Sequence, residues 1–408
     1  MKIILLEDHS IPNANMYTYW KVGSRNEVPG ITGLSHFFEH MMFNGSKNYP
    51  AGSFDKVMEA AGGSNNAFTT ENETVYTNWF PSSSLATILD LEADRIGTLQ
   101  FDQAKIDSER GVVLSERSTG LENEPWELLY QTLRSVAFTA HPYSWPVIGW
   151  ESDIKAWTKD DLQRYFATYY NPSNAVMVLV GDLSEQEVRP LIAAKLENIG
   201  RQGTVPPVRT IEPPQQGERR VFVVKPSSSS GQLMVAYHVP ESKHADYYAL
   251  DLLSEILAGG ASSRLYKSLV DEKRLAADVA VSFGTSLDPD LFMIQSTAIE
   301  GKDVRRLERA LLDDIEKIKN QGIKPEELTK AQNIKLVGLY RQMETINGKA
   351  GLLGTYEVFF GGYDQLFKAT ERYKAVTAAD LSRVLKAYFV KQNRTVGILD
   401  KRESSETP

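Results

Sequence analysis

The sequence has 408 residues, of which 42% are hydrophobic and 24% charged, as is typical of globular proteins. Its length predicts about two to three domains. The formal net charge of −8 argues against nucleic acid as the main partner. The absence of cysteine excludes disulfides, thiolate metal sites and a cysteine nucleophile, so any zinc site must use histidine and carboxylate ligands. No apolar run reaches the ~18 residues of a membrane span.

Met1 leads directly into residues 2–6, of which the last four are apolar, and this run predicts a strand. A domain that starts within a strand suggests that the native N-terminus lies upstream of Met1. A removed leader would be consistent with a periplasmic protein, and no signal peptide is present in the chain itself. A native start at Met1 and a cytoplasmic location stay open as alternatives.

The first half of the chain mixes strands and helices. In chain order we expect a strand at 2–7, a strand at 15–22, helices at 31–44 and 53–61, strands at 66–70 and 73–80, helices at 83–98, 102–119, 125–135 and 158–169, and a strand at 175–181. A Pro-rich segment then interrupts the pattern. Its two Pro-Pro pairs, at 206–207 and 213–214, are typical of an extended linker. The predicted domains are therefore 1–203 and 218–408, joined by a linker at 204–217.

The second half repeats the mixture. We expect strands at 220–225 and 231–238, helices at 244–258 and 262–271, strands at 277–284 and 290–298, helices at 301–320, 325–345 and 377–389, and a last strand at 395–399. An offset of 219 residues aligns Thr158 with Thr377 and Asn174 with Asn393 without a gap. We interpret this as an internal duplication. The predicted fold is α+β, with two homologous sandwich halves of mostly antiparallel sheet packed with helices.

One helix carries a candidate metal site. His36, Glu39 and His40 follow the i, i+3, i+4 spacing, which places two imidazoles and a carboxylate on one helical face. Two imidazoles one turn apart can hold Zn²⁺, and the neighbouring carboxylate can move a proton between water and a leaving amine. H-x-x-E-H is the inverted order of the zincin motif. The alternative is a histidine pair packed on a polar helix face.

A third ligand is needed for a catalytic zinc site. Glu109 and Glu116 are seven residues apart on the predicted helix at 102–119, so they share a face. Two histidines and one glutamate leave a fourth position open for water. By themselves, these two carboxylates are more typical of a solvated helix face.

The sequence resembles the pitrilysin family, which includes insulin-degrading enzyme, mitochondrial processing peptidase and their bacterial relatives. The resemblance covers essentially the whole chain and is carried by 33–43, 62–69, Tyr76, 91–95, 109–116, 141–143, Gly149 and 181–182. It implies a chain that forms half of a clamshell chamber for peptide hydrolysis. It further implies that His36, His40 and Glu116 bind one zinc ion, and that Glu39 acts as general base and then acid. Glu109 then orients a ligand histidine.

The resemblance also implies a substrate strand. Asn66, Ala67 and Phe68 would form the edge with which an extended peptide pairs, where small Ala67 lets a backbone approach and Phe68 walls a pocket. An ordinary edge strand is the alternative.

The chain departs from the family in its second half. Family members carry an arginine and, seven residues later, a tyrosine that help to hold the peptide and the oxyanion. These positions fall on Val270 and Ala277, neither of which has a side-chain donor. A shifted alignment would offer Arg264 or Arg274 instead. We therefore expect a zinc metalloendopeptidase subunit that forms a heterodimer with a homologous, zinc-free partner supplying the missing pair.

Two other functions are weighed against this one. A homodimer that is active without the arginine–tyrosine pair is the first. A non-catalytic scaffold, similar to the processing-peptidase-like subunits of respiratory complexes, is the second, although a scaffold has no need of the intact zinc set. A processing peptidase that removes targeting sequences is a narrower form of the main hypothesis, and nothing in the sequence selects it.

Overall fold

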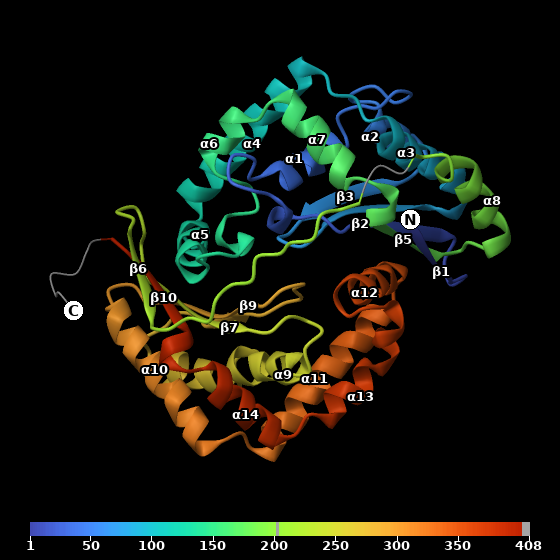
Figure 1. Ribbon diagram of the computed structural model, residues 1–408. Helices are drawn as coiled ribbons and strands as arrows, with labels where there is room; N and C mark the ends of the chain where they lie inside the picture. The colour runs from blue at the N-terminus through green and yellow to red at the C-terminus, as the bar shows by residue number, and fades with distance from the viewer. Residues whose placement is uncertain (201–203, 402–408) are drawn as a thin grey trace. The chain divides into compact units, whose positions relative to one another are not determined.

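The computed structural model of the protein describes residues 1–200 and 204–401, so the predicted boundary at residue 203 and the last residues of the predicted second domain lie outside the described residues. Two five-stranded sheets dominate this part of the chain (Figure 1). The contacts divide the chain into two compact units. Unit 1 comprises Met1–Ser118, Trp145–Arg209 and Tyr340–Leu366, and unit 2 comprises Thr119–Ser144, Thr210–Leu339 and Phe367–Pro408.

The sheet of unit 1 has the order β1-β5-β2-β4-β3. Its strands are β1 (Lys2–Glu7), β2 (Asn13–Trp20), β3 (Ser64–Thr69), β4 (Thr74–Pro81) and β5 (Ala175–Gly181). Strands β1 and β5 pair in parallel and the other neighbours pair antiparallel. The predicted mostly antiparallel sheet is confirmed, and β3 lies at one edge of it.

Alternation along β2 gives the sheet two apolar faces. On one face, Met16 and Trp20 join a core with Phe37, Phe38 and other residues of the helices that follow. The helices of unit 1 are α1 (Leu34–Met41), α2 (Phe54–Ala60), α3 (Leu85–Thr98), α4 (Gln103–Asn123, as far as Ser118), α6 (Glu151–Ala156), α7 (Lys159–Tyr169), α8 (Glu185–Leu196) and α12 (Ile346–Phe359).

Helix α12 lies against β2 and β5. Glycines make this approach possible, because a Cβ atom at Gly354 would lie 2.0 Å from the ring of Tyr19. The Tyr19 hydroxyl donates to the carbonyl oxygen of Gly351 at 3.1 Å. At the N-terminal end of the helix, Tyr17 donates to Asn347 at 2.6 Å.

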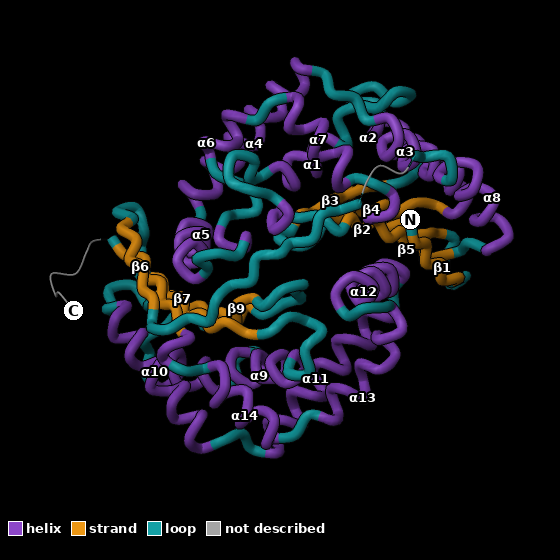
Figure 2. The backbone as a smooth tube through the Cα atoms, in the orientation of Figure 1, coloured by secondary structure: helices purple, strands orange, loops and turns teal. Residues whose placement is uncertain are grey.

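The sheet of unit 2 repeats the order of the first as β6-β10-β7-β9-β8. Its strands are β6 (Arg219–Val224), β7 (Gln232–Val239), β8 (Ala280–Ser282), β9 (Asp290–Thr297) and β10 (Arg394–Asp400). Its helices are α5 (Pro125–Ala137), α9 (Tyr247–Ala258), a π-helical segment (Tyr266–Glu272), α10 (Val304–Gln321), α11 (Pro325–Met343, as far as Leu339), α13 (Ala369–Ala375) and α14 (Ala378–Tyr388). Figure 2 shows the strands and helices of both units.

The two units share local contacts as well as the same order of strands. Thr158 and Thr377 each cap a helix by accepting a hydrogen bond from the backbone three residues later. The side chain of Asn174 donates to the carbonyl oxygens of Lys21 and Tyr169, and Asn393 makes the matching pair of bonds in unit 2. Both observations are what the predicted duplication requires.

The compact units differ from the predicted domains in two segments. Residues 119–144, which contain α5, belong to unit 2, and residues 340–366, which contain α12, belong to unit 1. Leu129 and Leu133 of α5 pack at Gly397 of β10, so this helix buries its apolar face on the second sheet. The sequence pattern predicts where helices form, but it does not say which of two similar sheets each one covers.

The linker also has a fixed attachment in unit 2. The carboxylate of Glu212 accepts hydrogen bonds from the backbone N–H groups of Thr139, Ala140 and His141 at 2.8–3.1 Å. Thr139, Ala140 and His141 lie beyond the C-terminal end of α5, so their N–H groups donate to this carboxylate rather than to carbonyl oxygens of the helix. The predicted extended segment is therefore anchored through the side chain of Glu212, and Gln215 adds a hydrogen bond to the carbonyl oxygen of Arg394 at 2.8 Å.

Candidate metal centre

Helix α1 presents the two histidines, and its start is fixed by the residues before it. Gly33 adopts a left-handed conformation with φ 89°, and a Cβ atom there would lie 2.4 Å from the carbonyl oxygen of Ile148. The buried carboxylate of Glu27 accepts hydrogen bonds from the N–H groups of Gly33 and Ser35 at 2.7 and 2.8 Å. These bonds satisfy free donors at the N-terminus of the helix.

Helix α1 is amphipathic in the way that its sequence predicts. Phe37, Phe38 and Met41 are fully buried in the core of unit 1. On the other face the rings of His36 and His40 lie with their centroids 4.8 Å apart and are largely covered. The core therefore fixes the orientation of the face that carries the two imidazoles.

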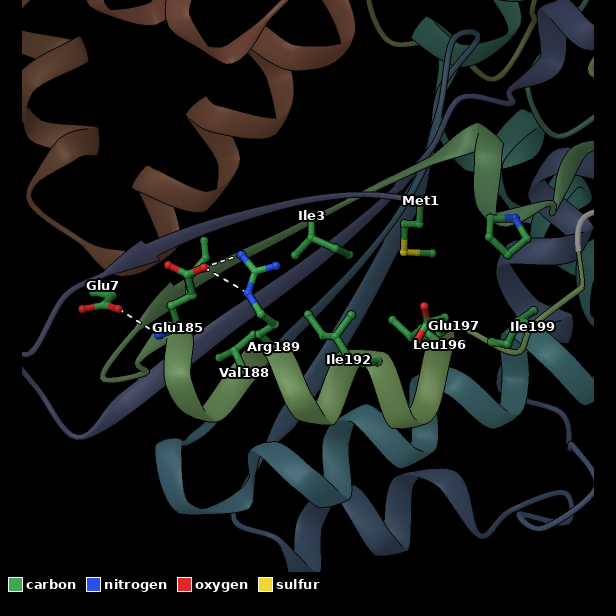
Figure 3. A pocket seen from close by; sticks show the side chains of 13 residues that line it. Met1, Ile3, Glu7, Glu185, Val188, Arg189, Ile192, Leu196, Glu197 and Ile199 are labelled. Atoms are coloured by element: carbon green, nitrogen blue, oxygen red, sulfur yellow. Dashed lines mark hydrogen bonds and ion pairs between the residues drawn. The ribbon is translucent and has the colours of Figure 1, made fainter.

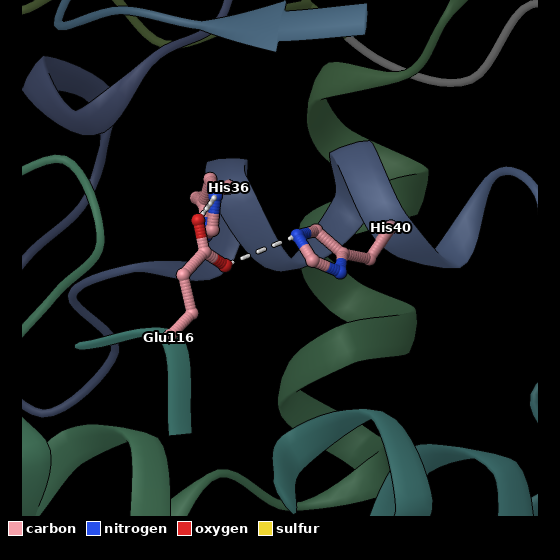
Figure 4. A group of neighbouring side chains, drawn as sticks. All are labelled: His36, His40 and Glu116. Atoms are coloured by element: carbon pink, nitrogen blue, oxygen red, sulfur yellow. Dashed lines mark ion pairs between the residues drawn. The ribbon is translucent and has the colours of Figure 1, made fainter. Parts of the chain in front are cut away.

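Glu116 of α4 completes the group (Figure 4). Its two oxygens lie 3.7 Å from Nε2 of His36 and 3.6 Å from Nε2 of His40. Ligands at ~2.0–2.1 Å in a tetrahedral zinc site are separated by about 3.3 Å, so this donor set fits a zinc ion. Among the described residues, this is the one group of three or more histidines, aspartates, glutamates or cysteines within metal-binding distance of one another.

Glu109 lies behind the group. Its Oε1 accepts a hydrogen bond from Nδ1 of His40 at 2.7 Å, and its Oε2 accepts one from Asn44 at 2.9 Å. The bond to His40 lowers the pKa of Glu109, although partial burial opposes the shift. This arrangement leaves Nε2 of His40 directed toward Glu116, as expected for a carboxylate that orients a metal ligand.

His36 and Glu39 of the motif have shifted pKa values. Burial, and secondarily the charge of His40, lowers the pKa of His36 to about 4, which keeps this imidazole neutral and able to bind a metal. Burial also raises the pKa of Glu39, while a hydrogen bond from Thr69 opposes the shift. A carboxylate with a raised pKa is better suited to accept a proton near neutral pH.

The edge strand β3 lies next to this face of α1. The hydroxyl of Thr69, at the end of β3, donates to Oε2 of Glu39 at 2.7 Å. Asn66 and Phe68 are exposed, and Ala67 is partly buried against the core. The structure therefore brings Glu39 and the predicted substrate strand together.

A buried arginine packs against aromatic side chains near Glu39. Arg95 of α3 is almost fully buried, forms an ion pair with Glu92 and lies 4.5–5.2 Å from the ring centroids of Phe43, Phe54 and Tyr76. Such cation–π contacts fix aromatic rings in place. Phe43 in turn lines the space beside Glu39.

The positions of the missing pair lie in unit 2. Val270 belongs to the π-helical segment and is half-buried, whereas Ala277 is exposed and its N–H donates to the carbonyl oxygen of Thr297. Arg264, one of the two shifted alternatives, is held by Glu327 and by the carbonyl oxygen of Gly322. Arg274 is exposed and has a φ of 50°.

The sequence analysis missed several residues around the site. Asn44, Thr69 and Glu27 contact the motif or the start of its helix, yet none of them has a distinctive spacing. Asn44 lies one turn beyond His40, and that proximity is the signal by which it could have been found. Thr69 and Glu27 become neighbours of the site only through the fold.

Another cavity lies elsewhere in unit 1. It has a volume of about 650 Å³ and lies between the edge strand β1 and helix α8 (Figure 3). Ile3, Leu5, Val188 and Ile192 give it apolar walls, and no histidine is among the described residues that line it. Three glutamates, Glu7, Glu185 and Glu197, also line it, but its described lining residues include no pair of imidazoles like the one on α1.

Known proteins match this chain over nearly its full length. The family model described as insulinase, peptidase family M16, matches residues 2–150, and the model described as the peptidase M16 inactive domain matches residues 156–335. A zinc protease of Helicobacter pylori, PqqE, is 33% identical over 373 residues, which cover 91% of this chain and 84% of the relative. The chain belongs to peptidase family M16.

Solved structures agree with this assignment. A protease from Helicobacter pylori matches with a TM-score of 0.93 and 31% identity over 97% of this chain and 96% of the other. A peptidase M16 inactive domain from Pseudomonas fluorescens matches with a TM-score of 0.88 and 19% identity over 99% and 96% of the two chains, which shows a shared fold. No helix within residues 1–200 and 204–401 is both long and apolar enough to cross a membrane.

Proposed function

We propose that this M16 chain is the zinc-binding subunit of a metalloendopeptidase that hydrolyses extended peptides. The observation that carries the proposal is the convergence of His36, His40 and Glu116 beside Glu39. The naming of relatives as zinc proteases supports the metal. Zinc in such a site supplies a Lewis acid that polarises a peptide carbonyl and lowers the pKa of water.

The side chains of this chain then have separate tasks. Glu39 accepts a proton from the attacking water and returns it to the leaving amine, and its covered position favours this exchange. Glu109 holds His40 in the orientation that keeps Nε2 free for the metal. Thr69 holds the carboxylate of Glu39 at the end of the edge strand.

The substrate is proposed to add a strand to β3. Main-chain bonds to Asn66, Ala67 and Phe68 would align the peptide along the sheet edge and bring one peptide bond near Glu39. The free edge of β3 and its neighbouring exposed side chains support this mode. An extended peptide can pair with β3 in this way, whereas a folded protein has few unpaired extended segments that could do so.

The chain is proposed to act with a homologous partner. Valine and alanine at positions 270 and 277 offer no side-chain donor for an oxyanion, and loss of one such donor typically reduces a rate by ~10²–10³. The engagement of Arg264 with Glu327 supports the same conclusion, because that side chain already has a structural role. A partner that lacks H-x-x-E-H but carries the arginine and tyrosine would complete the enzyme.

The test begins with the purified chain loaded with zinc. We expect one zinc per chain by elemental analysis and background cleavage of quenched peptides. Addition of the partner should restore turnover that a chelator abolishes. The Glu39→Gln variant should keep its zinc and lose turnover by about 10²–10⁴-fold.

Other results would select another function. Chelator-sensitive activity of the chain alone would refute the need for a heterodimer and favour the homodimer. A chain that binds no zinc would refute the peptidase and favour a scaffold. The proposed periplasmic location is tested separately by fractionation of cells, in which recovery in the cytoplasm would contradict it.

A further inference from the structure

A second cavity lies directly beside the candidate metal centre. It has a volume of about 330 Å³ and is bordered by α1, α2, α4 and β3. The residues that line it are Glu39, His40, Phe43, Asn44, Asp55, Asn65, Asn66, Ala67 and Glu109. Because it joins Glu39 to the proposed substrate strand, a peptide paired with β3 would place a side chain in it.

The walls of this cavity suit a long side chain with an apolar stem. The ring of Phe43 forms one wall, and it is held by Phe54 and by Arg95. Ala67 contributes only a methyl group, which leaves room between the strand and the ring. Lysine and arginine stems pack well against apolar surfaces of this kind while their charged ends stay in water.

One carboxylate is available at the open side. Asp55 is exposed, and Asn65 donates to its Oδ1 at 3.1 Å, which fixes the side chain at the rim. The carboxylates of Glu39 and Glu109 accept hydrogen bonds from Thr69, and from His40 and Asn44. The described residues that line the cavity include no lysine or arginine that would neutralise Asp55.

We propose that this cavity selects a lysine or arginine side chain of the substrate next to the scissile bond, with Asp55 as the residue that determines the preference. The inference rests on the proposed function, because it assumes that a peptide pairs with β3. Asp55 contacts the substrate side chain and takes no part in the proton transfers.

Binding of matched peptides tests this preference without requiring turnover. Capped, fluorescein-labelled alanine–valine peptides differ at one central residue, which is lysine, arginine or norleucine. Norleucine keeps an apolar stem and lacks the charge. Because the flanking sequence is repetitive, the peptide can pair with β3 in the register that places the central residue in the cavity. Fluorescence anisotropy is measured with zinc-loaded Glu39→Gln protein, together with the partner if turnover requires one.

We expect the lysine and arginine peptides to bind about fivefold more tightly than the norleucine peptide, which is near the upper limit for an accessible ion pair. Asp55→Asn keeps the shape and the contact with Asn65, and should reduce the ratio to about twofold or less. Glu59→Gln removes a charge from an exposed position of the same helix outside the cavity, and should leave the ratio unchanged. Added salt should also reduce the ratio in the unaltered chain.

The outcomes separate the inference from the proposed function. Equal binding of all three peptides, or an equal loss in the Asp55→Asn and Glu59→Gln variants, would overturn the role of Asp55 and leave the peptidase intact. A zinc-loaded protein that binds none of the peptides would refute both. Selective loss of the preference in Asp55→Asn supports the inference.

Discussion

The packing of α12 on the sheet of unit 1 gives a sharp test of the fold. Gly351 and Gly354 lie on the same helix, and both face tyrosine rings of β2. A Cβ atom at Gly354 would lie 2.0 and 2.2 Å from two ring atoms of Tyr19, whereas one at Gly351 would lie 3.9 Å from the ring of Tyr17. The first distance is a severe overlap and the second is an ordinary contact.

Gly354→Ala should therefore destabilise the protein while Gly351→Ala should not. Alanine in place of glycine stabilises a helix by about 1 kcal/mol. At Gly354 this gain is opposed by overpacking, which typically destabilises by about 1–3 kcal/mol. Tyr19 is only 2% exposed, so its ring cannot turn away without loss of its hydrogen bond to Gly351, worth about 1 kcal/mol. The net expectation is a loss of about 1–3 kcal/mol at Gly354 and a gain of up to about 1 kcal/mol at Gly351.

Urea unfolding followed by tryptophan fluorescence measures this difference. Every tryptophan except Trp126 lies in unit 1, so the signal reports mainly on the unit that contains α12. Equal midpoints for the two variants, or greater stability of Gly354→Ala than of the unaltered chain, would refute the packing of the helix against Tyr19.

Further predictions concern carboxylates. Glu109→Gln should weaken zinc binding about 10–100-fold in a competition assay with a chelating dye, because the acceptor that orients His40 loses its negative charge, and unchanged affinity would contradict this role. Glu212→Ala should destabilise unit 2 by about 1–3 kcal/mol near neutral pH, since three backbone donors lose their acceptor. Burial alone would raise the pKa of Glu212, but hydrogen bonds from those donors keep it below its usual 4.5. The stability difference between Glu212→Ala and the unaltered chain should therefore shrink as the pH falls through that lowered pKa. A pH-independent stability difference would refute the argument. Burial raises the pKa of Glu73 from 4.5 to about 8, so folding stability should fall as the pH rises from about 5 to 8, and thermal unfolding of Glu73→Gln should show a weaker decline.

The sequence by itself determined the local geometry of the candidate site. The spacing of His36, Glu39 and His40 places their side chains on one face of any α-helix, because the period of the helix is set by the backbone. The apolar stripe of the same helix likewise decides which face is buried. The predicted α+β fold and most of the strands follow from such short-range patterns.

Some elements escaped the sequence analysis for a physical reason. Helix α12 contains three glycines, at 348, 351 and 354, which lower helix propensity and weaken the pattern. Two of these glycines let the helix approach the rings of Tyr17 and Tyr19, which are far away in the sequence, so their role is evident only in the folded structure. The predicted strand at 277–284 is reduced to Ala280–Ser282, because β8 is a short edge strand with one neighbour.

Tertiary structure alone decided which groups meet. The sequence does not show that Glu116 reaches both histidines, that Thr69 holds Glu39, or that Asp55 borders the same cavity. It also does not assign α5 to the second sheet and α12 to the first. Local spacing is fixed by a few bonds and can be read from the chain, whereas contacts between distant segments depend on how all the apolar faces are buried together.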